Sequence, residues 1–77
     1  MSNTTLLNLV ERRRALPVPS ERRRLREAAK LSQDELGAHI GVSGPTICRY
    51  ESGHDPRGVK LDRYAEALLD LQQAVSS

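Results

Sequence analysis

A short stretch near the middle of the chain carries side chains that can donate and accept hydrogen bonds in a common direction. Arg49 has a planar guanidinium that can bind two acceptors at once, as arginine does on the edge of guanine. Thr46 offers a hydroxyl and a methyl group, and Ser43 a further hydroxyl. Ser43, Thr46 and Arg49 are spaced three apart and so lie on one face of a helix, with Cys48 as a further candidate for the outward side. We predict that this face reads DNA bases through Ser43, Gly44, Thr46 and Arg49.

Each of these residues could also serve a structural role. Arg49 could form a surface salt bridge with an acid such as Asp55, and Thr46 could be a plain helix-interior residue. Ser43 is expected to cap the helix even if it also touches phosphate. Cys48 is the only cysteine, so no intramolecular disulfide can form, and we expect a packing or groove-facing thiol rather than a redox switch.

Two short helices joined by three residues must position this face. Ser32 and Glu35 form a capping box, in which each side chain bonds the backbone N–H of the other, and this starts the first helix. Gly41 can take the left-handed conformation that ends it. Ser43 caps the second helix, which Ser52-Gly53 closes. Such a short turn forces the two helices to cross steeply, so that one protrudes and can enter the major groove. Gly37 should lie where the helices approach most closely, with Ile40, Val42, Ile47 and Tyr50 filling the space between them.

The remaining elements are also expected to be helical, because Phe and Trp are absent and apolar residues recur at spacings of three and four. One helix is predicted over residues 4–16 and ends at Pro17-Val18-Pro19. Another is capped by Ser20, has a narrow apolar face, and stops near Lys30. The last runs from about residue 59 to 73. Its apolar stripe is Leu61, Tyr64, Ala65, Leu68, Leu69, Gln72 and Val75, and that of the helix after Ser20 is Leu25, Ala28 and Ala29.

The basic residues are concentrated in the first part of the chain, although the net charge of all 77 residues is only +2. Residues 1–31 hold eight Lys and Arg against three acids, a balance of +5, and the remainder balances at −3. Arginine forks onto phosphate, so Arg12, Arg13 and Arg14 are candidate phosphate contacts, although the helix that carries them could instead cover the core or mediate dimerisation. His54 and Arg57, in the loop after the second short helix, are further candidates. The alternative is that these charges are the solvated faces of helices and loops.

Other classes of function lack support in the sequence. There is no recognisable Ser/His/Asp set, carboxylate pair or glycine-rich phosphate loop, so we do not expect an enzyme. Cysteine and histidine spacing predicts no metal site, and no cofactor is expected. With no apolar run long enough for a signal peptide or a membrane span, we expect a cytoplasmic protein without a membrane partner.

Four segments together resemble the Cro and lambda-repressor-like helix-turn-helix family: LREAA (25–29), LSQDELG (31–37), GVS (41–43) and TICRYESG (46–53). The resemblance covers about residues 22 to 69. It implies an all-α, lambda-repressor-like compact helical domain, here with an additional N-terminal helix. It also implies phosphate contacts by Gln33 and Ser52, and a structural ion pair between Arg26 and Glu51. Gly44 departs from the pattern, because many members carry a polar base-reading side chain there, so readout should depend on Thr46, Arg49 and DNA shape.

The resemblance predicts a Cro-like transcriptional repressor that binds double-stranded DNA as a homodimer on a palindromic operator. A chain of this length has no room for a sensing domain, so no small-molecule effector is expected. An antitoxin or a restriction-system controller that regulates its own operon would use the same fold. A protein-interaction domain on a helix-turn-helix scaffold is the alternative from another class.

Overall fold

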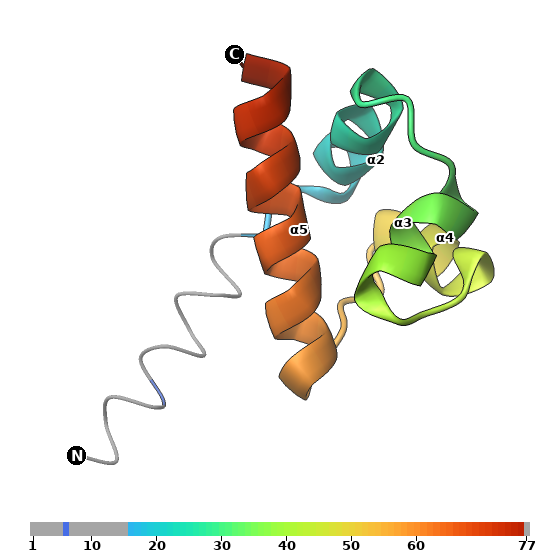
Figure 1. Cartoon of the computed structure of the whole chain (residues 1–77). Coiled ribbons are helices and arrows are strands. Elements are labelled where there is room, and N and C mark those ends of the chain that lie inside the picture. The colour runs from blue at the N-terminus through green and yellow to red at the C-terminus, as the bar shows by residue number, and fades with distance from the viewer. Residues whose placement is uncertain (1–5, 7–15, 77) are drawn as a thin grey trace.

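The computed structural model describes residue 6 and residues 16–76, and the regular structure of this part of the chain is entirely helical (Figure 1). The helices are α2 (Pro19–Ala28), α3 (Gln33–Ile40), α4 (Gly44–Glu51) and α5 (Gly58–Ser76). The predicted all-α fold is therefore confirmed. The predicted helix over residues 4–16 falls mostly outside the described residues. Of its two described positions, Leu6 is helical and exposed, and Leu16 is non-helical and buried.

The ends of α3 and α4 are set by local hydrogen bonds, as the sequence predicts. Ser32 Oγ accepts from the Glu35 amide at 3.0 Å, and Glu35 Oε1 accepts from the Ser32 amide at 2.9 Å. The bond from the Ser32 backbone to the Glu35 carboxylate holds the pKa of that carboxyl below its usual value. Gly41 ends α3 at φ 84°, in the left-handed region, and Ser43 caps α4 by accepting from the Thr46 amide at 3.3 Å.

The start and the buried face of α2 differ from the prediction. The helix begins at Pro19 with Val18 as its N-cap, so Ser20 lies inside the first turn and caps nothing. Proline suits a first helical position because its missing N–H would have no partner there. Ala28, predicted on the apolar face, is exposed. The buried face instead consists of Arg22, Leu25 and Arg26, since α2 turns two of its four arginines toward α4.

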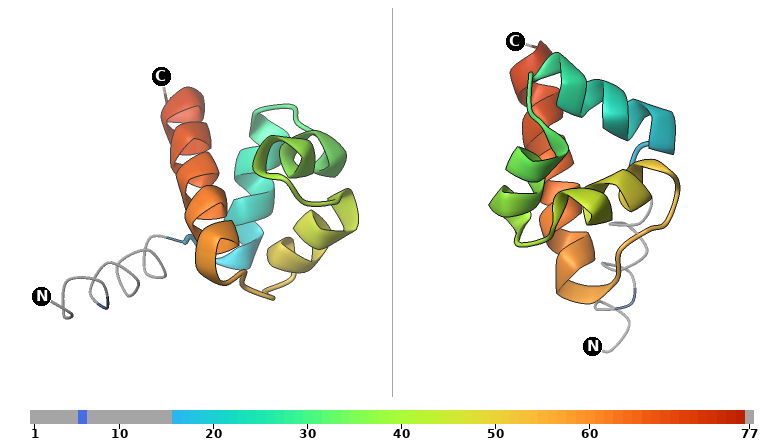
Figure 2. Two further views of the ribbon diagram at one scale, coloured as in Figure 1. Left: turned by 60° about the horizontal axis from the view of Figure 1, so that its bottom comes forward. Right: turned by 90° about the vertical axis from the view of Figure 1, so that its right-hand side faces the viewer.

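The core lies where α5 meets the other helices, with α5 along one flank and α3 and α4 side by side on the other (Figures 1 and 2). Leu61, Tyr64, Ala65 and Leu68 of α5 are buried as predicted. Leu69, however, is 46% exposed, and Gln72 is exposed too, so the predicted stripe is too wide on that side. The side chains that fill the core from the other helices include Leu25, Leu36, Ile40, Ile47 and Tyr50.

Two tyrosines meet at the centre of this core. The rings of Tyr50 on α4 and Tyr64 on α5 have centroids 4.8 Å apart at an interplanar angle of 48°. The Tyr64 hydroxyl is fully buried and has no hydrogen-bond partner among the described residues. Burial raises the pKa of Tyr64, because the phenolate would be poorly solvated there. This ring contact connects α4 directly to the long helix.

Candidate nucleic-acid interface

The turn between α3 and α4 depends on Gly37, which has no room for a side chain. A Cβ at this position would lie 2.5 Å from the Val42 carbonyl oxygen and 3.1 Å from the Ser43 carbonyl. The helix therefore passes directly against the backbone of the turn, as the sequence predicts. The close approach fixes the start of α4 relative to α3, and so fixes the direction in which α4 presents its outer face.

The two sides of α4 differ sharply in exposure. Ile47 and Tyr50 are buried in the core, while Cys48 and Arg49 are exposed. Thr46 is half-buried, and its hydroxyl lies 2.9 Å from the Ser43 hydroxyl, so these two candidate base-reading groups are hydrogen-bonded to each other. Arg49 is thus the long polar side chain on the outer face of α4.

The salt bridge to Asp55 that was considered as an alternative role for Arg49 is not formed in the described part of the chain. Asp55 accepts a hydrogen bond at 2.7 Å from Arg22, which reaches it from α2. That carboxylate pairs with α2, and among the described residues no salt bridge joins Arg49 to Asp55. Arg49 therefore projects from α4 without the competing interaction that the sequence suggested.

Gly44, another predicted base-reading position, is buried. The space in front of its Cα is taken by Asp34 of α3, whose Oδ1 would collide with a Cβ at residue 44. Asp34 itself stays exposed. The surface beside the first residue of α4 is therefore formed by a carboxylate from the neighbouring helix, which sequence reasoning did not anticipate.

An ion pair fixes the other end of α4. Arg26 of α2 donates to both carboxylate oxygens of Glu51, at 2.6 Å and 3.1 Å, and its third bond goes to the Leu31 carbonyl at 2.8 Å. The side chains of Arg26 and Glu51 are only 10% and 5% exposed. The hydrogen bond to Glu51 raises the pKa of Arg26. The ion pair that the resemblance implied is thus present. Through its three bonds, Arg26 connects α2 to α4 and to the segment before α3.

Arg22 is a second anchor that the sequence analysis missed. Its guanidinium is buried and donates to the Pro17 carbonyl at 2.7 Å, the Tyr50 carbonyl at 2.9 Å, and Asp55. The Tyr50 carbonyl lies in the last turn of α4, where a positive charge is favourable. The available signal was spacing: Arg22 lies four residues before Arg26 and so on the same face of α2.

The predicted phosphate contacts occupy three different environments. The Gln33 side-chain amide donates to Glu51 at 3.3 Å, so this side chain is held where the first residue of α3 meets the last residue of α4. Ser52 is exposed and its hydroxyl donates to the Cys48 carbonyl at 2.9 Å. His54 and Arg57 are exposed on the loop between α4 and α5. Arg12, Arg13 and Arg14 lie outside the described residues, so the structure places none of them.

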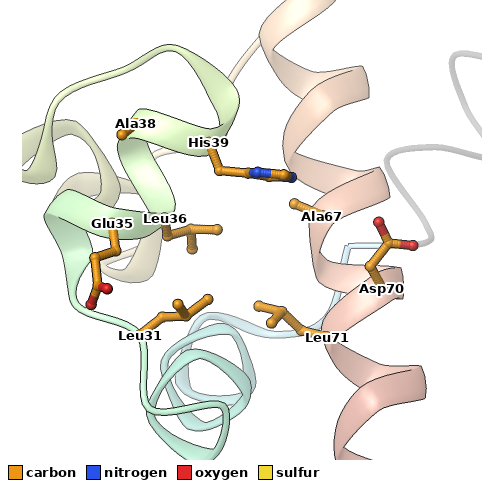
Figure 3. A pocket seen from close by; sticks show the side chains of 8 residues that line it. All are labelled: Leu31, Glu35, Leu36, Ala38, His39, Ala67, Asp70 and Leu71. Carbon is orange, nitrogen blue, oxygen red and sulfur yellow. The ribbon is translucent and has the colours of Figure 1, made fainter.

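A groove of about 490 Å³ opens on another part of the surface, between α3 and α5 (Figure 3). It has an apolar floor with polar side chains at its margins, and no residue of α4 contributes to it. The lining is formed by Leu31, Glu35, Leu36, Ala38, His39, Ala67, Asp70 and Leu71. The groove is therefore separate from the candidate interface.

The comparisons with known proteins agree with this geometry. A family model described as a helix-turn-helix domain matches residues 23–74, which include all of α3 and α4 and most of α2 and α5. No curated protein and no solved structure gives a significant match. In the described part of the chain, no three His, Cys, Asp or Glu side chains gather into a possible metal site, and none of its helices has the length and apolar character of a membrane span.

Proposed function

Since the chain belongs to the helix-turn-helix domain family, we propose that it is a sequence-specific transcriptional regulator whose α4 enters the major groove of DNA. The observation that carries this proposal is the contrast between the two sides of α4. One side is fixed by Ile47, Tyr50 and the Glu51 ion pair, while the other presents Arg49 outward. A rigidly held helix with an exposed arginine suits major-groove recognition, in which arginine binds guanine at two acceptors.

The surroundings of α4 support contacts to the DNA backbone. The side chains of Gln33 and Ser52 both bond to the last turn of α4, and His54 and Arg57 are exposed on the loop that follows it. The helix N-terminus at Gln33 adds backbone N–H groups, which favour anions. We assign these four residues to phosphate, which positions a protein on the duplex without specifying sequence.

The finer form of the proposal is a Cro-like repressor that binds a palindromic operator as a dimer. Two copies related by a two-fold axis would place their α4 helices in successive major grooves, about 34–36 Å apart. The exposed Leu69 on α5 lies on a candidate surface for the dimer contact. Support for this form comes from the resemblance in α3 and α4.

The test begins by selecting bound duplexes from random DNA and then measures affinity for the selected sequence and for a scrambled one. Arg49→Ala should bind the selected duplex with an affinity lowered roughly tenfold or more, because a bidentate contact to guanine contributes about 1–3 kcal/mol of discrimination. Its affinity for the scrambled duplex should fall much less. Arg24→Ala is the matched control, since Arg24 is an exposed arginine of α2 that bonds Glu21.

Equal losses for Arg49→Ala on the two duplexes would remove Arg49 from base reading. Absence of any salt-dependent binding to DNA would contradict the proposal as a whole, because phosphate contacts release counterions and make affinity fall with salt. That result would favour a protein-interaction domain on the same scaffold.

A further inference from the structure

The start of α4 has an unusual surface, because its first residue contributes no side chain and a carboxylate from α3 occupies the vacant place. A methyl group on Gly44 would collide with Asp34 Oδ1 and would lie 3.0 Å from Asp34 Cγ and 3.3 Å from the Asp34 amide nitrogen. Gly44 is buried under this carboxylate, whereas Asp34 is exposed. Whatever approaches residue 44 from outside therefore meets Asp34 first.

Its negative charge distinguishes Asp34 from the neighbouring hydroxyl groups at this end of α4. The Ser43 and Thr46 hydroxyls are hydrogen-bonded to each other at 2.9 Å. An ionised carboxylate only accepts hydrogen bonds, so it can face an amino group but is repelled by a phosphate. In the major groove, the donor that pairs with Asp or Glu is the N4 amino group of cytosine.

We propose that Asp34 is a specificity-determining residue that accepts a hydrogen bond from the N4 amino group of a cytosine in the target site. The proposal rests on the proposed function, in which α4 enters the major groove. Asp34 takes the place that a side chain at residue 44 would occupy, so the reading surface combines an acceptor from α3 with the Arg49 donor from α4.

Helix geometry separates the two proposed base contacts, one beside Gly44 and one at Arg49. Gly44 and Arg49 are five residues apart, which is about 7.5 Å along a helix. One base pair spans about 3.4 Å along the duplex. The cytosine read at the start of α4 should therefore belong to a different base pair from the guanine read by Arg49.

The test compares sequences selected from random DNA by the wild type and by Asp34→Asn. Asparagine has nearly the same size, so it keeps its position over Gly44, but it matches the adenine edge rather than cytosine. We expect the preferred base at one position to change from cytosine to adenine, with a loss of roughly tenfold in preference for cytosine. Asp70→Asn makes the same chemical change on the exposed surface of α5 and should leave the selected sequence unchanged.

A second measurement uses the wild-type protein alone. Replacing the assigned cytosine by thymine exchanges the N4 amino donor for an O4 acceptor, and we expect affinity for that duplex to fall roughly tenfold. If Asp34→Asn raises affinity for all duplexes equally and the selected sequence stays the same, Asp34 acts only through its charge and the inference is wrong. If the wild type selects no sequence at all, the proposed function itself fails, which is a distinct result.

Discussion

The most informative perturbation is the removal of Glu51 from the ion pair that fixes the end of α4. In Glu51→Ala, the Arg26 guanidinium keeps its bond to the Leu31 carbonyl but loses both bonds to the carboxylate. The Arg26 side chain is only 10% exposed, so water cannot fully replace these bonds. Breaking a buried pair on one side costs about 3–5 kcal/mol.

This cost is large compared with the whole stability of such a chain. At about 0.05–0.15 kcal/mol per residue, a chain of 77 residues has a free energy of unfolding of about 4–12 kcal/mol. Urea unfolding followed by circular dichroism should therefore show the free energy of unfolding of Glu51→Ala lowered by about 3–5 kcal/mol from the wild-type value. Glu21→Ala is the control, because it breaks a second Arg–Glu pair on α2 in which Arg24 is 58% exposed, and exposed pairs contribute little.

The double variant Arg26→Met/Glu51→Leu separates the two contributions. It removes both charges and fills the site with apolar side chains of similar size, so most of the lost stability should return. The reasoning would be refuted if Glu51→Ala lowered the free energy of unfolding by no more than Glu21→Ala does. It would also be refuted if the loss in the double variant equalled the sum of the losses in Arg26→Met and Glu51→Leu. Its DNA affinity should stay below that of the wild type, because Gln33 loses its acceptor on Glu51.

Three further changes test other parts of the structure. Tyr64→Phe removes a buried hydroxyl that has no partner among the described residues, so it should raise the free energy of unfolding by about 1–3 kcal/mol in denaturant titrations. Burial raises the pKa of Tyr64, so as the pH rises the unfolded state loses the hydroxyl proton before the folded state does. The free energy of unfolding of the wild type should therefore fall as the pH rises above 10.0, the ordinary pKa of tyrosine. Denaturant titrations at pH 9 and pH 11 should show a smaller fall in Tyr64→Phe. Ser32→Ala removes the cap of α3 and should lower stability by about 1 kcal/mol in thermal unfolding, whereas Ser32→Asp should retain most of it. Gly37→Ala would press a methyl group against the Val42 carbonyl and should lower both the melting temperature and DNA affinity, whereas unchanged values would show that the turn can yield.

The ends of α3 and α4 could be predicted because their signals are local. The capping box of Ser32 and Glu35, the left-handed Gly41 and the Ser43 cap each involve residues at most four apart, so their hydrogen bonds depend on little beyond the neighbouring backbone. The same holds for the tight approach at Gly37, which a short turn between two helices requires. The geometry that aims α4 is therefore readable from the sequence.

The burial of individual residues could not be predicted in the same way, because it depends on partners distant in the chain. Leu69 continues an apolar stripe on α5 but remains 46% exposed in the described part of the structure. Ala28 continues a stripe on α2, yet the helix turns another face inward. The spacing of residues gives the direction in which a side chain leaves its own helix. Whether that direction faces the core depends on how the other helices pack against it.

The arginines of α2 show this limit most clearly. Arg22, Arg23, Arg24 and Arg26 are nearly continuous in the sequence, and charge alone predicts one solvated basic surface. In the structure, Arg23 and Arg24 pair with acids of their own helix and stay exposed, while Arg22 and Arg26 are buried against α4. The difference arises because Tyr50, Glu51 and Asp55 supply acceptors from 25 to 33 residues away. Two of the four arginines of α2 are therefore used to hold α4 in place, so less positive charge is exposed on α2 than the sequence suggests.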